Sequence, residues 1–169
     1  MTFLGKALAE RNGLLRSGGS PGADTAFEKG CDLAGGRKEI FLPWRGFNGS
    51  DSPLFNTPAE AMEMAFRIHP GLDRRHWKVK KLRARNVCQI LGPSLNDPSD
   101  LVIAWTESGL PSGGTATVLR IAEERGIPAI NLGQREFSGL TGEAILDRAL
   151  DLTGQRFENK PGNQLKDSR

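Results

Sequence analysis

Residues 108–132 read SGLPSGGTATVLRIAEERGIPAINL, and this stretch decides the fold of the chain. It follows an apolar run, residues 101–105, that has the length and β-branched content of a buried strand. After a loop rich in glycine, serine and proline, apolar residues recur at helical spacing as far as Gly126, and residues 129–132 have the pattern of another strand. The order strand, glycine loop, helix, strand predicts a βαβ unit of a parallel sheet.

The loop of this unit, residues 108–115, is a candidate anion site and is called the second glycine loop below. In a parallel sheet it lies at the carboxyl ends of the strands, where free N–H groups and the positive end of a helix dipole attract anions. Gly113, Gly114 and Thr115 would present N–H groups to a ligand phosphate, and Thr117 would add a hydroxyl. An ordinary turn, in which glycine only relieves backbone strain, is an equal alternative.

The N-terminal part of the chain repeats this architecture with a different sequence. Leu14–Ser17 is predicted as a short strand that leads directly into the first glycine loop, residues 18–24. A helix with one apolar face follows, and residues 39–42 are the next predicted strand. Because both glycine loops follow parallel strands, we expect them to open on the same edge of the sheet.

Four residues in and beside the first glycine loop are candidate ligand contacts: Ser17, Gly18, Gly19 and Asp24. Asp24 stands at the start of its helix, where a carboxylate can accept a hydrogen bond from a ribose hydroxyl. It can equally stabilise the helix dipole, by about 0.3–1 kcal/mol. Ser17 has two similar alternatives, a ligand contact or a hydrogen bond at the end of its strand.

A long excursion, residues 43–57, leaves the second predicted strand at its carboxyl end. Loops of this length are uncommon in compact domains and are often functional. Trp44 is a candidate for stacking on a base, and the alternative is that it plugs the edge of the sheet. Thr57 is predicted to cap the next helix, and a further helix is predicted over residues 73–91.

The helix predicted over residues 73–91 carries seven Lys or Arg between Arg74 and Arg85. Such a run suggests a surface for phosphate groups. A solvated helix face is the commoner explanation, and it is expected for Lys78, Lys80 and Lys81. The two histidines lack partners at ligand spacing, so we expect no metal site.

Composition predicts one domain. With 169 residues and 37% hydrophobic content the chain can bury a single core, so residues 1–152 are predicted as the domain and residues 153–169, where apolar residues become rare, as a loose tail.

The chain lacks an apolar run of membrane-spanning length and an apolar signal-peptide core, which predicts a cytoplasmic protein without a membrane partner. Cys31 and Cys88 are predicted as reduced core thiols. The formal charge of +3 permits a nucleotide or nucleic-acid partner.

The two glycine motifs, SGGSPGAD and PSGGT, in this order resemble the SLOG superfamily of Rossmann-like proteins. That superfamily includes DNA-processing protein A, the Lonely Guy phosphoribohydrolases and many nucleotide-ligand binders, and the chain looks most like its small bacterial and phage members. The resemblance covers roughly residues 14–132. It implies an α/β fold, a Rossmann-like three-layer sandwich with a mostly parallel sheet, and an oligomer such as a homodimer.

Two segments are similar to parts of the phosphoribohydrolase pattern. Residues 82–86 resemble the Met-x-x-Arg-Lys segment of these enzymes, which would place Arg85 at the functional arginine. Residues 111–115 resemble their Pro-Gly-Gly-x-Gly-Thr motif, with Gly114 and Thr115 at its Gly-Thr. Where the family has its catalytic glutamate, three positions further on, this chain has Val118. The position therefore lacks the carboxylate that cleavage of a glycosidic bond needs.

The residues and the resemblance together predict a protein that binds a nucleotide or nucleotide-derived small molecule through both glycine loops. No catalytic residue and no cofactor are assigned, because the missing glutamate favours binding without catalysis. The first alternative is hydrolysis of a nucleotide N-glycosidic bond, for which Glu28, Asp24 or a carboxylate of the excursion would have to serve. The second alternative is single-stranded DNA binding, by analogy with DNA-processing protein A.

Overall fold

The computed structural model describes residues 1–154, and the segment 155–169, which holds nearly all of the predicted tail, lies outside the described residues. Within residues 1–154, six α-helices alternate with four parallel strands. Strand β1 (Leu14–Ser17) pairs with β2 (Arg37–Ile40), and β3 (Val102–Ala104) pairs with β4 (Ala129–Asn131). The predicted α/β class and the parallel direction of the strands are confirmed.

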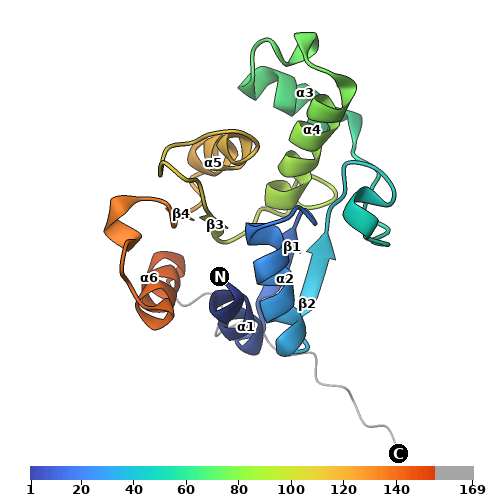
Figure 1. Cartoon of the computed structure of the whole chain (residues 1–169). Helices are drawn as coiled ribbons and strands as arrows, with labels where there is room; N and C mark the ends of the chain where they lie inside the picture. The colour runs from blue at the N-terminus through green and yellow to red at the C-terminus, as the bar shows by residue number, and fades with distance from the viewer. Residues whose placement is uncertain (155–169) are drawn as a thin grey trace, which may run out of the picture.

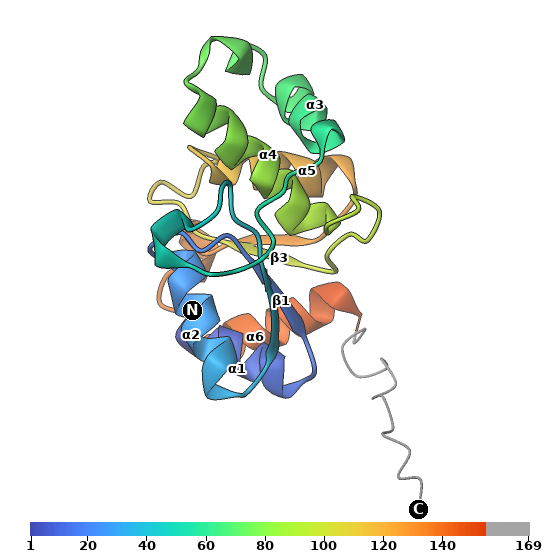
Figure 2. The same ribbon diagram turned by 90° about the vertical axis from the view of Figure 1, so that its right-hand side faces the viewer.

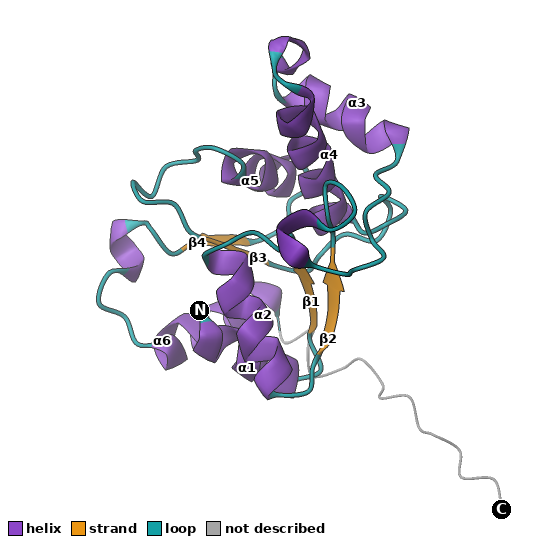
Figure 3. Cartoon of the chain, turned by 45° about the vertical axis from the view of Figure 1, so that its right-hand side comes forward, coloured by secondary structure: helices purple, strands orange, loops and turns teal. Residues whose placement is uncertain are grey.

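Helices cover both sides of the strands, so the molecule has three layers (Figures 1 and 3). One outer layer contains α1 (Thr2–Glu10), α2 (Ala23–Leu33) and α6 (Gly142–Thr153). The other contains α3 (Ala59–Ile68), α4 (Trp77–Leu91) and α5 (Thr115–Glu124). None of the helices in residues 1–154 is long and apolar enough to cross a membrane.

The side chains of β3 point alternately into two cores. Val102 and Ala104 are buried in the core formed with α3, α4 and α5, whereas Ile103 packs against the core on the side of α1, α2 and α6. This alternation is the period of two expected for a strand that is covered on both faces. Figure 2 shows β3 between the two helical layers.

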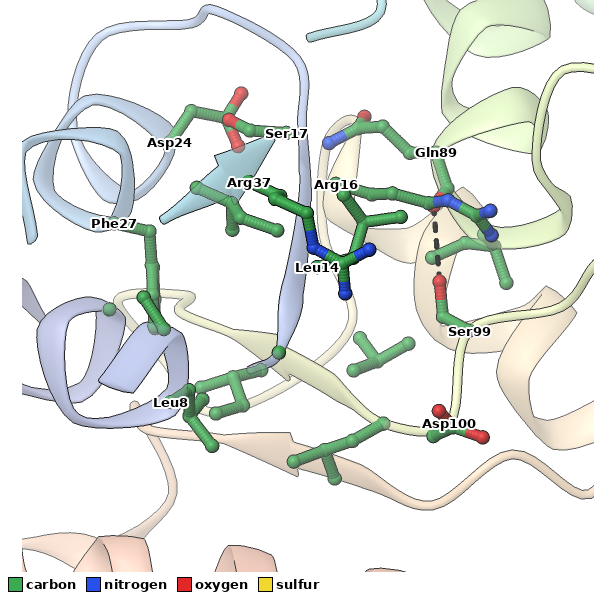
Figure 4. A pocket seen from close by; sticks show the side chains of 18 of the residues that line it. Leu8, Leu14, Arg16, Ser17, Asp24, Phe27, Arg37, Gln89, Ser99 and Asp100 are labelled. Carbon is green, nitrogen blue, oxygen red and sulfur yellow. Dashed lines mark hydrogen bonds between the residues drawn. The ribbon is translucent and has the colours of Figure 1, made fainter. Parts of the chain in front are cut away.

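The strands form two small sheets and not one, because β1 and β3 do not pair with each other. A cavity of about 220 Å³, here called the inter-sheet cavity, lies between these strands (Figure 4). Arg16 of β1 reaches the segment before β3: its guanidinium donates to the main-chain oxygen and to the carboxylate of Asp97, both at 2.5 Å. The two sheets are therefore connected by the contact of Arg16 with Asp97, where a single sheet would have backbone hydrogen bonds between β1 and β3.

The predicted bounds of the strands need small corrections. β2 begins at Arg37 and ends at Ile40, opposite Ser17, the last residue of β1. The N–H of Phe41 still donates to Ser17 at 2.8 Å, and the N–H of Leu42 donates to Leu54 of the excursion at 2.7 Å. β3 and β4 are each shorter than predicted, and Trp105, expected within a strand, follows β3 and is exposed.

The helix predicted over residues 73–91 is wrong in its first part. A 3-10 turn, Leu72–Arg74, comes first, and α4 begins only at Trp77. His76 caps α4 by accepting a hydrogen bond from the N–H of Lys78 at 3.3 Å. The break leaves Arg74 outside the helix, on the 3-10 turn that precedes α4.

The predicted cap of α3 is also wrong. The residue that precedes α3 is Pro58, one position later than the predicted Thr57, and no side chain caps this helix. Proline supplies a fixed φ near the value that a helix start needs, so the helix begins there without a capping hydroxyl.

Candidate functional site

Helix α4 connects the two glycine loops. Arg85 donates a hydrogen bond to the main-chain oxygen of Gly18 in the first glycine loop. The next residue, Asn86, donates from Nδ2 to the main-chain oxygen of Gly114 in the second glycine loop, at 3.0 Å. The loops, separated by about ninety residues of sequence, are therefore positioned by neighbouring residues of one helix, as expected for loops at a common edge.

Arg85 is buried, with 4% of its surface exposed, and its guanidinium holds the first glycine loop in place. Nη1 donates to the main-chain oxygens of Gly18 and Phe41, the latter at 3.2 Å, and Nη2 donates to the Ser20 hydroxyl at 3.3 Å. These acceptors occupy both terminal nitrogens. Arg85 is thus a positioning residue for the loop, and its contact with a ligand stays a prediction.

The guanidinium of Arg85 has both charged and aromatic groups around it. Burial lowers its pKa, while the negative charges of Asp24 and Glu28 act in the opposite direction. The ring of Phe47 lies 5.8 Å from the guanidinium carbon. Nε is buried and has no hydrogen-bond partner within residues 1–154. The positive charge is therefore balanced by carboxylates at a distance and not by a direct ion pair.

The glycines of the first loop are needed by the chain itself. A Cβ atom on Gly18 would overlap the guanidinium of Arg85. Gly19 has φ +64°, in the left-handed region that favours glycine. Both residues are explained without a ligand, so their presence is no evidence for one.

Ser17 and Asp24 also have partners inside the protein. The Ser17 hydroxyl donates to Glu28 Oε1 at 2.6 Å. Asp24 Oδ2 accepts from the N–H of Ser20 at 3.0 Å, across the first glycine loop. For both side chains the structure shows the internal hydrogen bond, and the predicted ligand contact would come in addition to it.

The second glycine loop contains two glycines with different explanations. Gly113 has φ +52°, so the backbone itself favours glycine there. Gly114 has φ −65° and ψ −38°, which any residue adopts in a helix. The nearest atom to a Cβ on Gly114 would be Asn86 Nδ2 at 3.4 Å, an ordinary contact. Neither the backbone nor a neighbour requires glycine at position 114.

The backbone of this loop offers free donors. Ala116 donates to Ser112 at 3.0 Å, but the N–H groups of Gly113, Gly114 and Thr115 make no hydrogen bond to any residue in 1–154. Gly113 and Gly114 are exposed. The start of α5 therefore presents a set of unpaired N–H groups to solvent, where the helix dipole is positive.

Thr117 is fully buried, which differs from its predicted contact with a phosphate. Its hydroxyl lies 2.7 Å from His69 Nε2 and accepts from Arg83 Nη1 at 3.0 Å. Arg83 also donates to the main-chain oxygen of Gly113. Thr117 thus anchors two basic side chains beneath the second glycine loop.

The excursion after β2 folds over the first glycine loop. Asn48 donates to the main-chain oxygen of Gly19 at 2.9 Å. Trp44 packs edge-on against Phe47 and Trp77, with ring centroids 5.1 and 5.5 Å away. Trp44 is half-buried in this aromatic cluster, so part of its ring is already covered, and stacking on a base stays a prediction.

Val118 lies on α5, one helical turn after the second glycine loop. It lines the inter-sheet cavity, whose walls also include Ser17, Asp24 and the apolar side chains of Leu14 and Phe27 (Figure 4). Figure 4 shows Asp24 and Ser17 at one end of this cavity, and the lining contains no residue of the second glycine loop. The position of the missing glutamate therefore faces this cavity, one helical turn after the free N–H groups of that loop.

Sequence reasoning missed Arg83 and Asn86, which contact the second glycine loop directly. Only their proximity to Arg85 on α4 could have indicated them. Among the lysines of α4, Lys78 and Lys81 are exposed as predicted, whereas Lys80 is half-buried with Nζ 5.8 Å from the ring of Phe66. In the described part of the chain there is no group of three or more His, Cys, Asp or Glu placed to hold a metal ion.

Comparison of the chain with models of protein families, with curated proteins and with solved structures finds no match. The resemblance to the SLOG superfamily stays a prediction, as do the homodimer and the single-stranded DNA binding that it suggests. A functional conclusion must therefore come from the geometry of the loops.

Proposed function

We propose that this protein binds a nucleotide or nucleotide-derived small molecule, with a phosphate group on the free N–H groups of the second glycine loop. The observation that carries the proposal is Gly114. Gly114 precedes α5 as its N-cap residue, but its φ and ψ (−65° and −38°) are helical and not the extended values that a capping residue usually has. In helical backbone glycine is less favourable than alanine by about 0.5–1 kcal/mol. Since nothing in the fold requires glycine there, close approach of an external group to the backbone explains its presence.

The rest of the ligand would extend along α4 toward the first glycine loop. Asn86 and Arg85 fix one loop each, so the two loops keep a constant separation. The aromatic cluster of Trp44, Phe47 and Trp77 lies beside Arg85 at this end, since the Phe47 ring contacts the guanidinium. A base could stack on the exposed part of this cluster while its phosphate stays on the second loop.

Binding without cleavage fits the side chains better than hydrolysis does. The position that would carry the glutamate is Val118, and it faces the inter-sheet cavity. Asp24 and Glu28, the carboxylates that could replace it, are engaged with Ser20 and Ser17. A general acid or base must reach the reacting atoms, and these internal hydrogen bonds hold both carboxylates on the protein's own groups.

The test is calorimetry with a panel of nucleoside mono-, di- and triphosphates, preceded by mass spectrometry of any small molecule that co-purifies. Gly114→Val places a branched side chain between the ligand and the N–H groups and should abolish binding, while Gly114→Ala should weaken it less. Ser112→Val, an exposed position in the same loop, is the matched control and should bind as the wild type does. Unchanged binding by Gly114→Val, or release of a free base by the wild type, would refute the proposal.

A further inference from the structure

A second concave site lies where α3, the 3-10 turn and α4 meet, in the green part of the chain in Figure 1. It is a pocket of about 540 Å³ and is called the arginine pocket here. Its walls include His69, Leu72, Arg74, Arg75, Val79 and Arg83. No aspartate or glutamate is among the described residues that line it.

The positive charges of the arginine pocket are not balanced by carboxylates. Arg74, Arg75 and Arg83 form no ion pair with any residue in 1–154, in contrast to Arg16, which pairs with Glu39 and Asp97. The charges of Arg75 and Arg83 repel each other, and Asp73, the carboxylate of the same turn, forms no ion pair with any residue in 1–154. An anion bound from solvent would relieve this repulsion.

The pKa values of Arg83 and His69 are shifted in the direction that an excess of positive charge produces. The pKa of Arg83 is lowered by burial and further by the charges of Arg75 and Arg120. The pKa of His69 is likewise lowered by burial and then by Arg83 and Arg120. His69 is therefore neutral near pH 7, and its Nε2 is held by the Thr117 hydroxyl at 2.7 Å.

The 3-10 turn and the residue after it carry Arg74 and Arg75, whose side chains are exposed to solvent. Gly71 has φ +91°, in the left-handed region that favours glycine, and the Arg74 guanidinium lies close to it. Leu72 is buried and anchors the turn in the core. Arg74 and Arg75 are exposed, so their charged ends are accessible at the pocket mouth while Arg83 forms its inner wall.

We propose that the arginine pocket is an anion site for a polyphosphate group, that is, at least two linked phosphates. Guanidinium groups bind phosphate oxygens in bidentate pairs, and the charge of a pyrophosphate near neutral pH balances three of them. The site is separate from the second glycine loop, since the pocket lining contains none of the loop's residues. The two sites adjoin through Arg83, which donates to Gly113.

The proposal is tested by calorimetric titration of the full chain with sodium pyrophosphate at low salt. The wild type should show saturable binding, and the double variant Arg74→Gln, Arg75→Gln should bind about tenfold more weakly or worse, because charge-assisted hydrogen bonds are lost. These two side chains are exposed, so the fold should survive their replacement. Lys81→Gln, an exposed position on α4 outside the pocket, is the matched control and should change the affinity less than twofold.

Three further arms identify the ligand and its place. Orthophosphate should bind much more weakly than pyrophosphate. A nucleoside diphosphate that binds more tightly than pyrophosphate would mean that the group belongs to a nucleotide, and equal affinities would mean that a free polyphosphate suffices. Gly114→Val should retain pyrophosphate binding even where it loses nucleotide binding. Loss of pyrophosphate binding in Gly114→Val would place the anion on the glycine loop and overturn the proposal.

A nuclear magnetic resonance titration reports on the pocket directly. The chain has two histidines, so His76→Asn, which keeps a capping side chain, leaves His69 as the single imidazole. Bound pyrophosphate adds negative charge beside Arg83 and should raise the pKa of His69. An unchanged pKa at saturating pyrophosphate, no saturable binding by the wild type, or an equal loss of affinity in Lys81→Gln would each overturn the assignment.

Discussion

Asn86 Nδ2 donates a hydrogen bond to the main-chain oxygen of Gly114 at 3.0 Å. The same oxygen accepts from the N–H of Thr117 at 3.1 Å in the first turn of α5, so the carbonyl has one donor from α4 and one from its own helix. The neighbouring N–H groups of Gly113, Gly114 and Thr115 make no hydrogen bond within residues 1–154. The Asn86 side chain is buried, with 6% of its surface exposed, so its hydrogen bond to Gly114 helps to fix the orientation of that peptide group. The donor set that we assign to a phosphate is thus held by α4.

Asn86→Asp should therefore affect both stability and binding. A carboxylate cannot donate to the Gly114 carbonyl and is repelled by it, so the free energy of unfolding should fall by about 1–3 kcal/mol. Nucleotide binding should weaken because the loop loses its orientation. Urea unfolding and calorimetry measure the two effects. Gln89→Glu, the same chemical change at a half-buried position one turn further along α4, is the control, and an equal loss there would remove the special role of Asn86.

Arg85→Lys should destabilise the protein although it keeps the charge. A lysine has one nitrogen and cannot serve the carbonyls of Gly18 and Phe41 and the Ser20 hydroxyl together. Leaving buried acceptors unpaired should lower the free energy of unfolding by about 2–3 kcal/mol.

The matched control for this change is Lys81→Ala, at an exposed position of the same helix, which should change stability by less than about 0.5 kcal/mol. Ligand affinity should follow the same order, with a much larger loss for Arg85→Ala than for Lys81→Ala. Equal effects at the two positions would mean that Arg85 does not organise the first glycine loop.

The two βαβ units could be predicted from the sequence because their signals are local. Apolar runs of strand length, glycine loops and helical spacing all lie within short windows, and β1 was predicted with the bounds that the structure shows. The gap between the sheets could not be predicted in this way. It involves contacts such as Arg16 with Asp97, which are 81 residues apart in sequence.

The candidate site was predicted in part. Its glycine loops were found, but Arg83 and Asn86 were missed, because a charged or amide side chain within a basic helix gives no pattern that tells a contact from a solvated face. The break before α4 was missed for a related reason. Arginine favours helices, so Arg74 and Arg75 gave no sign of a turn, and histidine is not among the residues preferred as caps.

Stability should decline in alkaline solution because of Cys88. Burial raises the pKa of its thiol to about 11, above the ordinary value near 9 that applies in the unfolded chain. Between these pH values the unfolded state has lost the proton and the folded state has kept it, so unfolding becomes easier as pH rises through this window. The loss should be on the order of 1–3 kcal/mol, and it should be absent below pH 8.

The measurement is urea unfolding of the wild type and of Cys88→Ala between pH 7 and pH 11. The variant should be less stable at pH 7 but should lose less stability toward high pH. The chain has no tyrosine, so phenol ionisation does not contribute to the difference. Parallel curves for the two proteins would show that the Cys88 thiol does not carry the alkaline loss.

Val118→Glu should destabilise the fold without creating a hydrolase. The new carboxylate would face the inter-sheet cavity, whose lining combines apolar side chains such as Leu14 and Phe27 with charged ones such as Arg16 and Asp24. Its burial there should raise its pKa. The folded state would then hold its proton more tightly than the unfolded state, so the stability deficit should grow as pH rises above about 4. Val118→Gln introduces an uncharged side chain of the same size as glutamate, so its loss of stability should not vary with pH. Release of a free base from a nucleoside monophosphate by Val118→Glu would revive the hydrolase alternative.

The two glycines at the start of α5 should respond differently to alanine. Gly113→Ala forces a side chain into the left-handed region at φ +52° and should lower the free energy of unfolding by about 1–2 kcal/mol. Gly114→Ala meets no such strain at φ −65°, and its Cβ would make only an ordinary contact with Asn86, so stability should stay unchanged or rise by up to about 1 kcal/mol. Urea unfolding of both variants, with nucleotide calorimetry on Gly114→Ala, separates the structural glycine from the one that serves a ligand. A large loss of stability in Gly114→Ala would show that the fold does need glycine at this position, and the phosphate site would then lose its main support.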